Sequence, residues 1–319
     1  MKLLKITLGL IVSAICLYLA LKGIAWNTVF ATIVAANFLL LIPAILLHFT
    51  AFYIRAIKWS IITSKIKPIS AIKLFPIVAI GLAMNNVLPL RAGEFGRIVL
   101  LSNTHGISKV ESTITIIIER IFDIVGLLVI LLVFLKLRAW PGYANALINS
   151  AGIFLLICIV SIPVVFYFSD RLLKLPYLKK LQGLKIITDI QGGYKTYHTD
   201  YFLMLKTLLL SVSLWFVEGL GYFVMANMFS LHISFPDIIF ICALVNISSI
   251  VPATAGFIGT FEFFATGLLV FTGITRAKAL AYVLVLHAEL ILPITIVGIV
   301  LYFTGKYYNY LTFKTLEQS

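Results

Sequence analysis

The sequence is poor in charge, in cysteine and in clustered reactive side chains. Charged residues make up 12% of the 319 residues, against roughly 25% in an ordinary soluble domain, so the class of soluble globular proteins is excluded. The three cysteines, Cys16, Cys158 and Cys242, lie singly in apolar runs without CxxC spacing, which argues against a disulfide framework or a metal site. There is also no nucleophile elbow and no phosphate-binding loop ending in Lys-Ser/Thr. We therefore expect no cofactor, no metal and no enzymatic activity.

Hydrophobic residues dominate what is present. They account for 61% of the chain, the mean hydropathy is +1.09, and the apolar runs are long and continuous. A transmembrane β-barrel would instead show alternating segments of about ten residues, so we predict an all-α, polytopic integral membrane protein. The net charge of +13 fits Lys and Arg in cytoplasmic loops near anionic headgroups better than it fits nucleic-acid binding.

A polar stretch, Asn85–Arg97, interrupts this apolar sequence. It reads NNVLPLRAGEFGR and carries two Arg, one Glu and two Asn, which are costly at membrane depth and therefore indicate a function. Within it, residues 89–96 follow the pattern P-x-x-A-G-x-x-G, and residues 252–259 follow the same pattern about half a chain later. We interpret the two motifs as the marks of an internal repeat.

The apolar runs divide the chain into expected helices. Trp26–Asn37 alternates small, aromatic and polar residues and is expected to be an interfacial helix, whereas Asn103–Gly106 is expected to be a turn. Arg55, Lys58 and Trp59 end the second run and are expected at the cytoplasmic headgroups, where basic and aromatic residues are enriched. Full spans are predicted at about residues 4–21, 38–62, 108–135, 146–168, 202–229 and 279–303.

Loop charge predicts the topology. The loops at Lys65 and at Lys174–Lys185 are both basic and belong on the cytoplasmic side, so an even number of crossings separates them. Each motif must then join two short helices that return to the side from which they start, as re-entrant hairpins do. We predict six full spans plus two re-entrant hairpins, with a cytoplasmic amino terminus. A model with ten full spans places the loops on the same sides and remains an alternative.

These elements form one transmembrane domain over residues 1–319. The first repeat is placed at about 38–168 and the second at about 201–303, inverted with respect to each other. Between them, a segment at about 170–200 carries several Lys and Arg and is expected to lie as an amphipathic helix on the cytoplasmic face. The expected location is the cytoplasmic membrane of a prokaryote, with multiple passes.

The polar groups at the first helix break predict an anion site. Arg91 and Arg97 flank the break, where guanidinium groups and freed backbone N–H groups suit a phosphate; structural pairing with Glu94 is the alternative. The residues expected to bind a lipid headgroup are Arg91, Arg97, Glu94, Asn85, Asn86 and Gly93. The residues expected to form a polar core or gate are Glu119, Arg120, Asp123, Glu218, Asn246, Pro252, Gly256, Gly259, Glu262, His287 and Glu289.

Several of these residues also have a structural interpretation. The charges within or at the edges of the spans, Arg55 among them, would pair off and hold the helices together. Glu119 and Asp123 share a helix face, and Arg120, one step round, would clamp a neighbouring motif. The glycines of both motifs are small enough to let the two hairpin tips approach closely. Glu218, His287 and Glu289 are candidate proton carriers, or groups that are simply hydrogen-bonded.

Three stretches together resemble the lysylphosphatidylglycerol synthase transmembrane-region family of flippase-like integral membrane proteins. They read NNVLPLRAGEFGRIVLL, IIIERIFDIVGLLV and NISSIVPATAGFIGTFE, and the resemblance covers nearly the whole chain. It implies a role in moving or handling lipids between leaflets, among them aminoacylated phosphatidylglycerol, polyprenol-linked sugars and hopanoid-type lipids. It also implies a family polar core at Arg91, Gly93, Glu94, Arg97, Glu119, Arg120, Asp123, Pro252, Gly256, Gly259 and Glu262.

The full-length synthases of this family carry a soluble aminoacyltransferase domain after the membrane part. The sequence ends at Ser319 without such a domain, so lysine transfer is not expected. We predict a translocase of a phosphate-bearing lipid, either a phospholipid or a polyprenyl-phosphate-linked lipid, with membrane lipids as partners. The alternative is a non-catalytic membrane subunit of a lipid or cell-envelope glycan pathway, with a synthesising enzyme docked at the cytoplasmic face.

Overall fold

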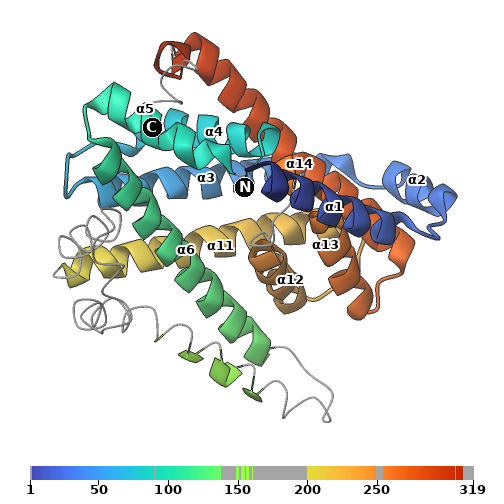
Figure 1. Cartoon of the computed structure of the whole chain (residues 1–319). Helices are drawn as coiled ribbons and strands as arrows, with labels where there is room; N and C mark the ends of the chain where they lie inside the picture. Colours follow the sequence, from blue (N-terminus) through green and yellow to red (C-terminus); the bar gives the residue numbers. More distant parts are fainter. Residues whose placement is uncertain are drawn as a thin grey trace.

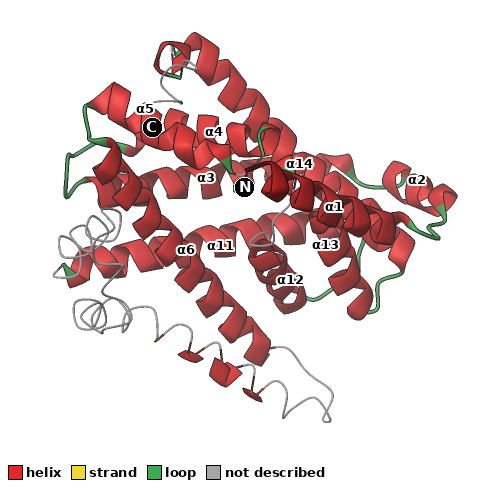
Figure 2. Cartoon of the chain, in the orientation of Figure 1, coloured by secondary structure: helices red, strands yellow, loops and turns green. Residues whose placement is uncertain are grey.

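The computed structural model describes residues 2–89, 91–137, 200–248, 254–305 and 307–311, with a few positions between 149 and 160. Every regular element in these ranges is helical (Figure 2), which confirms the all-α fold. The main helices are α1 (Lys2–Leu21), α2 (Trp26–Val34), α3 (Leu41–Thr63), α4 (Ala71–Val87), α5 (Ala92–His105), α6 (Lys109–Leu137), α11 (Tyr201–Met228), α12 (Phe235–Ser248), α13 (Thr260–Phe271) and α14 (Arg276–Thr304). Helices α3 and α11 make the most extensive contact, and α14 packs along α4 (Figure 1).

In the part of the chain that the structure describes, three helical segments are long and apolar enough to cross a membrane, namely Phe38–Thr63, Tyr201–Met228 and Arg276–Thr304. The surface is apolar as well, because Val34, Leu39 and Phe303 are 83%, 76% and 64% exposed. Such large apolar exposure needs lipid around it, so the chain is an integral membrane protein. The number of full spans stays a prediction.

The chain turns sharply between α1 and α2. The part of α1 that follows Gly9 and the whole of α2 meet at 84° across residues 22–25. The left-handed backbone at Gly23, φ 70°, lies in this turn, a conformation that glycine adopts without a steric penalty. A separate helix at the predicted interfacial segment is thus confirmed.

The two motifs each lie between two short helices. Helices α4 and α5 have 17 and 14 residues, and α12 and α13 have 14 and 12. At about 1.5 Å per residue they are shorter than the roughly 30 Å hydrocarbon core. The Lys67 ammonium, just before α4, donates to the carbonyl of His105 at the end of α5, at 2.7 Å, so this pair returns to where it starts. The first hairpin is therefore confirmed, whereas its depth in the membrane and the inversion of the repeat stay predictions.

Local chemistry explains the first break. Arg91, the residue before α5, has φ 54°, a left-handed conformation that costs a non-glycine residue about 1–3 kcal/mol. Asn85 compensates by accepting the Gly93 N–H at 2.8 Å. Gly93 also packs on the carbonyl of Gly81, where a Cβ atom would clash. The second motif breaks differently, with positive φ at three positions, Gly256, Phe257 and Gly259.

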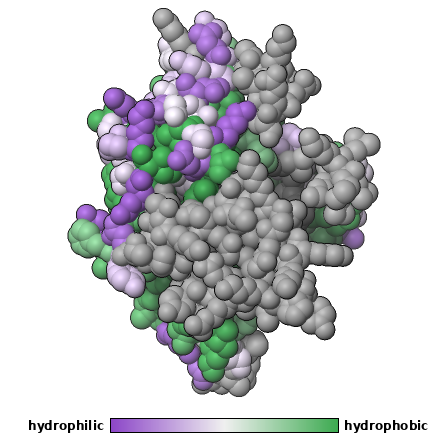
Figure 3. Space-filling view, turned by 60° about the vertical axis from the view of Figure 1, so that its left-hand side comes forward, coloured by the Kyte–Doolittle hydropathy of each residue, from purple (hydrophilic) through white to green (hydrophobic). Residues whose placement is uncertain are grey.

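Figure 3 turns the left-hand side of Figure 1 forward, and in its upper part hydrophilic residues lie among hydrophobic ones. Lys65, after α3, lies 2.6 Å from the Asp200 carboxylate, before α11. This hydrogen bond holds the pKa of Asp200 below its ordinary value. The two chain segments thus lie on the same side, as loop charge predicts. Most of the predicted span at 146–168 and the connection at 170–199 lie outside the described residues.

Two expectations are wrong. Arg55, Lys58 and Trp59 are 6%, 0% and 0% exposed and therefore do not sit at the headgroups, because α3 turns this stripe toward α6 and α11. Asn103–Gly106 is also not a free turn. Helix α5 continues through His105 and ends at Gly106, whose φ of 68° closes the helix.

Candidate functional site

A set of buried charges lies where α3, α5 and α6 meet. We call it the α6 charge cluster; it consists of Arg55, Lys58, Glu94, Arg97, Glu119, Arg120 and Asp123. Glu119 is fully buried and lies at its centre, within 2.5–3.2 Å of the guanidinium groups of Arg55, Arg97 and Arg120. A buried carboxylate is tolerated when it is paired and hydrogen-bonded in this way. Glu119 therefore holds α3 and α5 against α6, which is the predicted structural pairing.

Asp123, one turn further along α6, extends the cluster to α11. Its carboxylate accepts from Arg55 at 2.7 Å and from the Lys58 ammonium. Lys58 also donates to the Ser211 hydroxyl of α11 at 3.1 Å, and the Trp215 indole donates to the Asp123 carbonyl at 2.8 Å. Three helices are thereby tied together through one buried acid.

Arg97 belongs to this supporting cluster. Its side chain is 4% exposed, its two terminal nitrogens face Glu119 at 2.5 and 3.2 Å, and its guanidinium lies 4.1 Å from the centre of the Trp59 ring. The pairing is thus with Glu119 and not with Glu94. Glu94 instead lies 3.6 Å from Arg120, which confirms that Arg120 clamps the first motif.

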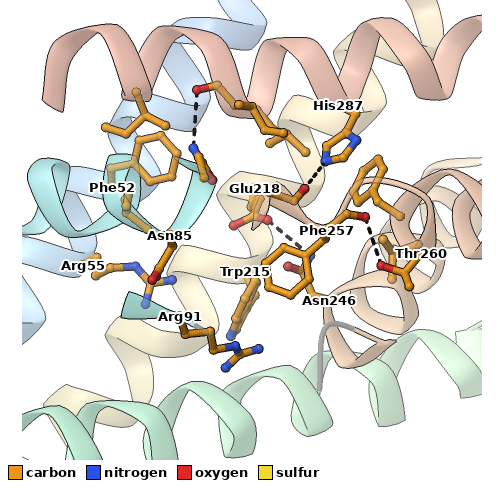
Figure 4. Close-up of a pocket in the computed structure, with 18 of the residues that line it drawn as sticks. Phe52, Arg55, Asn85, Arg91, Trp215, Glu218, Asn246, Phe257, Thr260 and His287 are labelled. Atoms are coloured by element: carbon orange, nitrogen blue, oxygen red, sulfur yellow. Dashed lines mark hydrogen bonds between the residues drawn. The ribbon is translucent and has the colours of Figure 1, made fainter. Parts of the chain in front are cut away.

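A cavity of about 220 Å³ lies between the two hairpin tips, in front of the charge cluster. We call it the tip cavity (Figure 4). Its charged wall is formed by Arg55, Arg91, Glu94 and Arg120. Further polar groups at the cavity are the amides Asn85, Asn86 and Asn246, the acid Glu218 and the imidazole of His287. The aromatic surface comes from Phe52, Trp215, Tyr222, Phe257 and Phe261. Small-molecule sites combine apolar walls with a few placed polar groups in this way.

The two tips meet at this cavity. The guanidinium carbon of Arg91 lies 5.6 Å from the centre of the Phe257 ring, within the range of a cation–π contact. Asn86 of α4 donates to the Thr295 hydroxyl of α14 at 2.9 Å, and its backbone lies against Gly256. The predicted close approach of the tips is therefore confirmed.

The second tip is tied to α14 and α1. His287 lies 2.5 Å from Glu262 of α13 through Nδ1 and 2.8 Å from the Gly256 carbonyl through Nε2. Glu262 also accepts the Gly259 N–H at 2.6 Å, and Thr254 donates its N–H to the Ser13 hydroxyl at 3.0 Å. These contacts fix the backbone between the helix break and the start of α13.

Two further acids are paired nearby. Glu289 lies 2.6 Å from the Nδ1 atom of His48 on α3, and both side chains are buried. Glu218 of α11 accepts from the Asn246 amide at 3.2 Å (dashed line in Figure 4). The predicted proton carriers are therefore divided between two histidine–carboxylate pairs and one acid–amide pair.

The structure brings only part of the predicted site to the cavity. The predicted residues that line it are Asn85, Asn86, Arg91, Glu94, Arg120, Glu218, Asn246, Gly256 and His287. Those that support it from behind are Gly93, Arg97, Glu119, Asp123, Gly259, Glu262 and Glu289. Pro252 lies outside the described residues.

Sequence reasoning missed His48 and Lys58 of α3 as members of the site, and it counted Arg55 among the buried charges without assigning it to the site. A signal existed in the sequence, because His48, Arg55 and Lys58 are seven and three residues apart, a spacing that places them on one face of a helix. In the structure they lie on the buried stripe of α3, which contains Ala44, His48, Ala51, Arg55, Lys58, Trp59 and Ile62. Polar groups that recur on one helical stripe share a face, so the stripe predicts that they point together into the protein.

Comparison with known proteins adds to this geometry. The model of a family described as lysylphosphatidylglycerol synthase TM region matches residues 6–298. The chain is also 24% identical over 278 residues to a UPF0104 membrane protein of Methanothermobacter thermautotrophicus, a match that covers 82% of this chain and 83% of the relative. No solved structure matches the chain.

Proposed function

The chain belongs to the lysylphosphatidylglycerol synthase TM region family, and from this premise we propose that it is a translocase for a phosphate-bearing lipid. It acts in the cytoplasmic membrane, with its amino terminus in the cytoplasm, as a transporter and not as an enzyme. The headgroup enters the tip cavity while its acyl or polyprenyl tails stay in the bilayer. The two hairpins then expose the cavity alternately to the two leaflets, as transporters with broken helices do.

The observation that carries this proposal is an excess of positive charge. The charged groups that line the cavity are the guanidinium groups of Arg55, Arg91 and Arg120 and the carboxyl groups of Glu94 and Glu218. Even if both carboxyl groups are ionised, cations outnumber carboxylates by one at the cavity wall. Excess charge at membrane depth is costly, so an anionic ligand is favoured.

The position of the cations favours a phosphate. Arg91, Arg55 and Arg120 approach the cavity from the first tip, α3 and α6, respectively. Guanidinium groups from several directions match the oxygens of a phosphate better than those of a single carboxylate. Arg97, whose guanidinium is held by Glu119 and Trp59, is assigned to the support of this wall and not to the ligand.

The size of the cavity favours a headgroup over a whole lipid. At about 220 Å³ it is smaller than the roughly 300–1,000 Å³ of pockets that bury a whole drug-sized ligand. A phosphate with a small polar substituent fits such a space. The tails then lie outside it, along the apolar surface of the helices.

Reconstitution tests the proposal. Purified protein in unilamellar vesicles should move a fluorescent phosphate-bearing lipid between leaflets, measured as the fraction that becomes accessible to an impermeant quencher. Vesicles without protein give the background rate. If the protein leaves that rate unchanged for both phospholipid and polyprenyl-phosphate probes, the proposed function fails and a non-transporting subunit becomes the better description.

A further inference from the structure

Both ring nitrogens of His287 face hydrogen-bond acceptors. Nδ1 lies 2.5 Å from Oε1 of Glu262, and Nε2 lies 2.8 Å from the carbonyl oxygen of Gly256. The side chain is buried, and the Phe261 ring stacks on the imidazole with 4.1 Å between ring centres. The stacked ring shields one face of the imidazole and restricts its rotation.

Counting protons shows what this geometry requires. A neutral imidazole has one N–H, and a carboxylate and a carbonyl can only accept. Neutral His287 with ionised Glu262 can therefore make only one of the two hydrogen bonds. Both bonds form only when the pair holds one additional proton, either as imidazolium with carboxylate or as imidazole with carboxylic acid.

The two bonds hold the second hairpin tip. Gly256 has φ 64° at the helix break and lies against the Asn86 backbone, and the next residue, Phe257, packs on Arg91. Glu262 also accepts the Gly259 N–H through its other oxygen, at 2.6 Å. If the bond from His287 to Gly256 is lost, the tip is released from α14 at the wall of the tip cavity.

We propose that His287 and Glu262 form a proton-binding site, and that binding of one proton latches the second hairpin tip against α14 at the wall of the tip cavity. Release of the proton leaves a single imidazole N–H, which stays with the Glu262 carboxylate because a charge-assisted hydrogen bond is the stronger one. The bond to the Gly256 carbonyl is then lost, and the tip is freed. Transport through the cavity is thereby coupled to protons. The existence of the latch does not depend on the ligand, whereas its coupling to transport rests on the proposed function.

The other charged groups around the pair determine how headgroup and proton influence each other. Two acids face the cavity, Glu218 from α11 and Glu94 from α5. Three cations face it, Arg91 from the first tip, Arg55 from α3 and Arg120 from α6. Glu289, two residues after His287 on α14, pairs with His48. The cations disfavour an additional proton, and a bound phosphate offsets them. Headgroup and proton therefore bind cooperatively, each strengthening the other by the same factor.

Hydrogen–deuterium exchange of the backbone amides at 254–262 tests the latch without any transport assay. In the wild-type protein in detergent, protection corrected for the intrinsic rate should fall at least tenfold as pH rises through one midpoint. Glu262→Gln should keep the protection at every pH, because its amide donates to Nδ1 as a carboxylic acid would and leaves the Nε2 proton for Gly256. His287→Leu should lack the protection at every pH.

Glu289→Gln is the matched control, since it neutralises the other paired acid of α14 and leaves both contacts of His287 in place. It should keep the wild-type midpoint. The proposal is overturned if wild-type protection has no midpoint, or if Glu262→Gln lowers the protection as His287→Leu does. The second outcome would mean that the carboxylate is merely structural.

A short-chain phosphatidylglycerol, added as a phosphate probe, separates the latch from the proposed function. We expect it to move the midpoint to higher pH by at least half a unit. A midpoint that exists but does not respond to the probe, together with vesicles that show no lipid movement, leaves the latch standing and removes the translocase. Lipid movement in vesicles, together with exchange protection that has no midpoint, removes the latch and leaves the translocase standing.

Discussion

The Arg91 guanidinium lies 5.6 Å from the centre of the Phe257 ring, so a cation–aromatic contact links the tips of the two hairpins. Both residues have left-handed backbone, with φ 54° and 57°. Their side chains therefore depend on two strained breaks that face each other. The positive charge belongs to the first tip, whereas the described part of the second tip carries only the acid Glu262. The cavity is therefore electrically asymmetric, and we expect the proposed phosphate on the Arg91 side.

This contact leads to a first prediction. Phe257→Leu removes the aromatic face and lets Arg91 move, at a cost of about 0.5–2 kcal/mol, which is the usual strength of a cation–π contact. We expect the rate of lipid movement in vesicles to fall about threefold or more, whereas Phe257→Tyr keeps the face and should retain the rate. Equal rates in the Leu and Tyr variants would argue against a role for the contact.

A second prediction concerns the buried charge cluster. Arg97→Met leaves Glu119 short of its bidentate partner, and breaking a buried pair typically costs about 3–5 kcal/mol. Thermal unfolding in detergent should therefore occur at a clearly lower temperature. Adding Glu119→Gln to the Arg97→Met variant removes the uncompensated carboxylate charge and should restore part of the lost stability. If Arg97→Met leaves stability unchanged and affects only lipid binding, Arg97 belongs to the ligand site and its assignment to the supporting cluster is wrong.

A third prediction tests the close packing of the first hairpin. Gly93→Ala puts a Cβ atom against the Gly81 carbonyl and should destabilise the protein by about 1–3 kcal/mol, the usual cost of overpacking. Gly267→Ala is the control, because no atom lies within 4 Å of the added carbon. Alanine is the better helix former by about 1 kcal/mol, so this variant should be as stable as the wild type or more stable. The same unfolding temperature in both variants would contradict the packing.

A fourth prediction tests the topology. Lys65 and Asp200 form an ion pair across the turn after α3 and the start of α11. In a background without native cysteines, Lys65→Cys and Asp200→Cys should react with an impermeant maleimide from the same side of the membrane. Ser230→Cys, in the loop after α11, should react only from the other side. Labelling of Lys65→Cys and Asp200→Cys from opposite sides would refute the arrangement of α3 and α11.

The fate of individual residues shows how far sequence reasoning reached. The first hairpin, its break at Pro89 and the clamp from Arg120 to Glu94 followed from loop charge, from the motif and from helical spacing. The sequence did not predict that Arg120 lines the cavity and that Arg97 does not. This difference depends on how α5 and α6 are rotated about their axes, and helices that are apolar on most faces give little periodicity to fix that rotation.

Partners that are distant in the sequence were equally hard to predict. His48 pairs with Glu289, and Lys58 with Asp123, and no local pattern links the members of such pairs. Lys58 and Trp59 near the end of an apolar run are typical of a membrane interface. Burial becomes possible only because α6 provides a carboxylate opposite them, which is a property of packing and not of local sequence.

The central claim is that Arg91 receives the phosphate of a lipid headgroup, and one ratio tests it most directly. In vesicles, the rate at which a phosphate-bearing lipid moves between leaflets is divided by the rate for a matched glycolipid without phosphate. This ratio is measured for the wild type, for Arg91→Gln and for Lys73→Gln. The last variant is the control, because it removes an exposed charge from the same hairpin. A charge-assisted hydrogen bond contributes about 1.5–3 kcal/mol. We therefore predict that Arg91→Gln lowers the ratio at least tenfold and that Lys73→Gln leaves it unchanged. A ratio of one in the wild type, or an unchanged ratio in Arg91→Gln, would contradict the account.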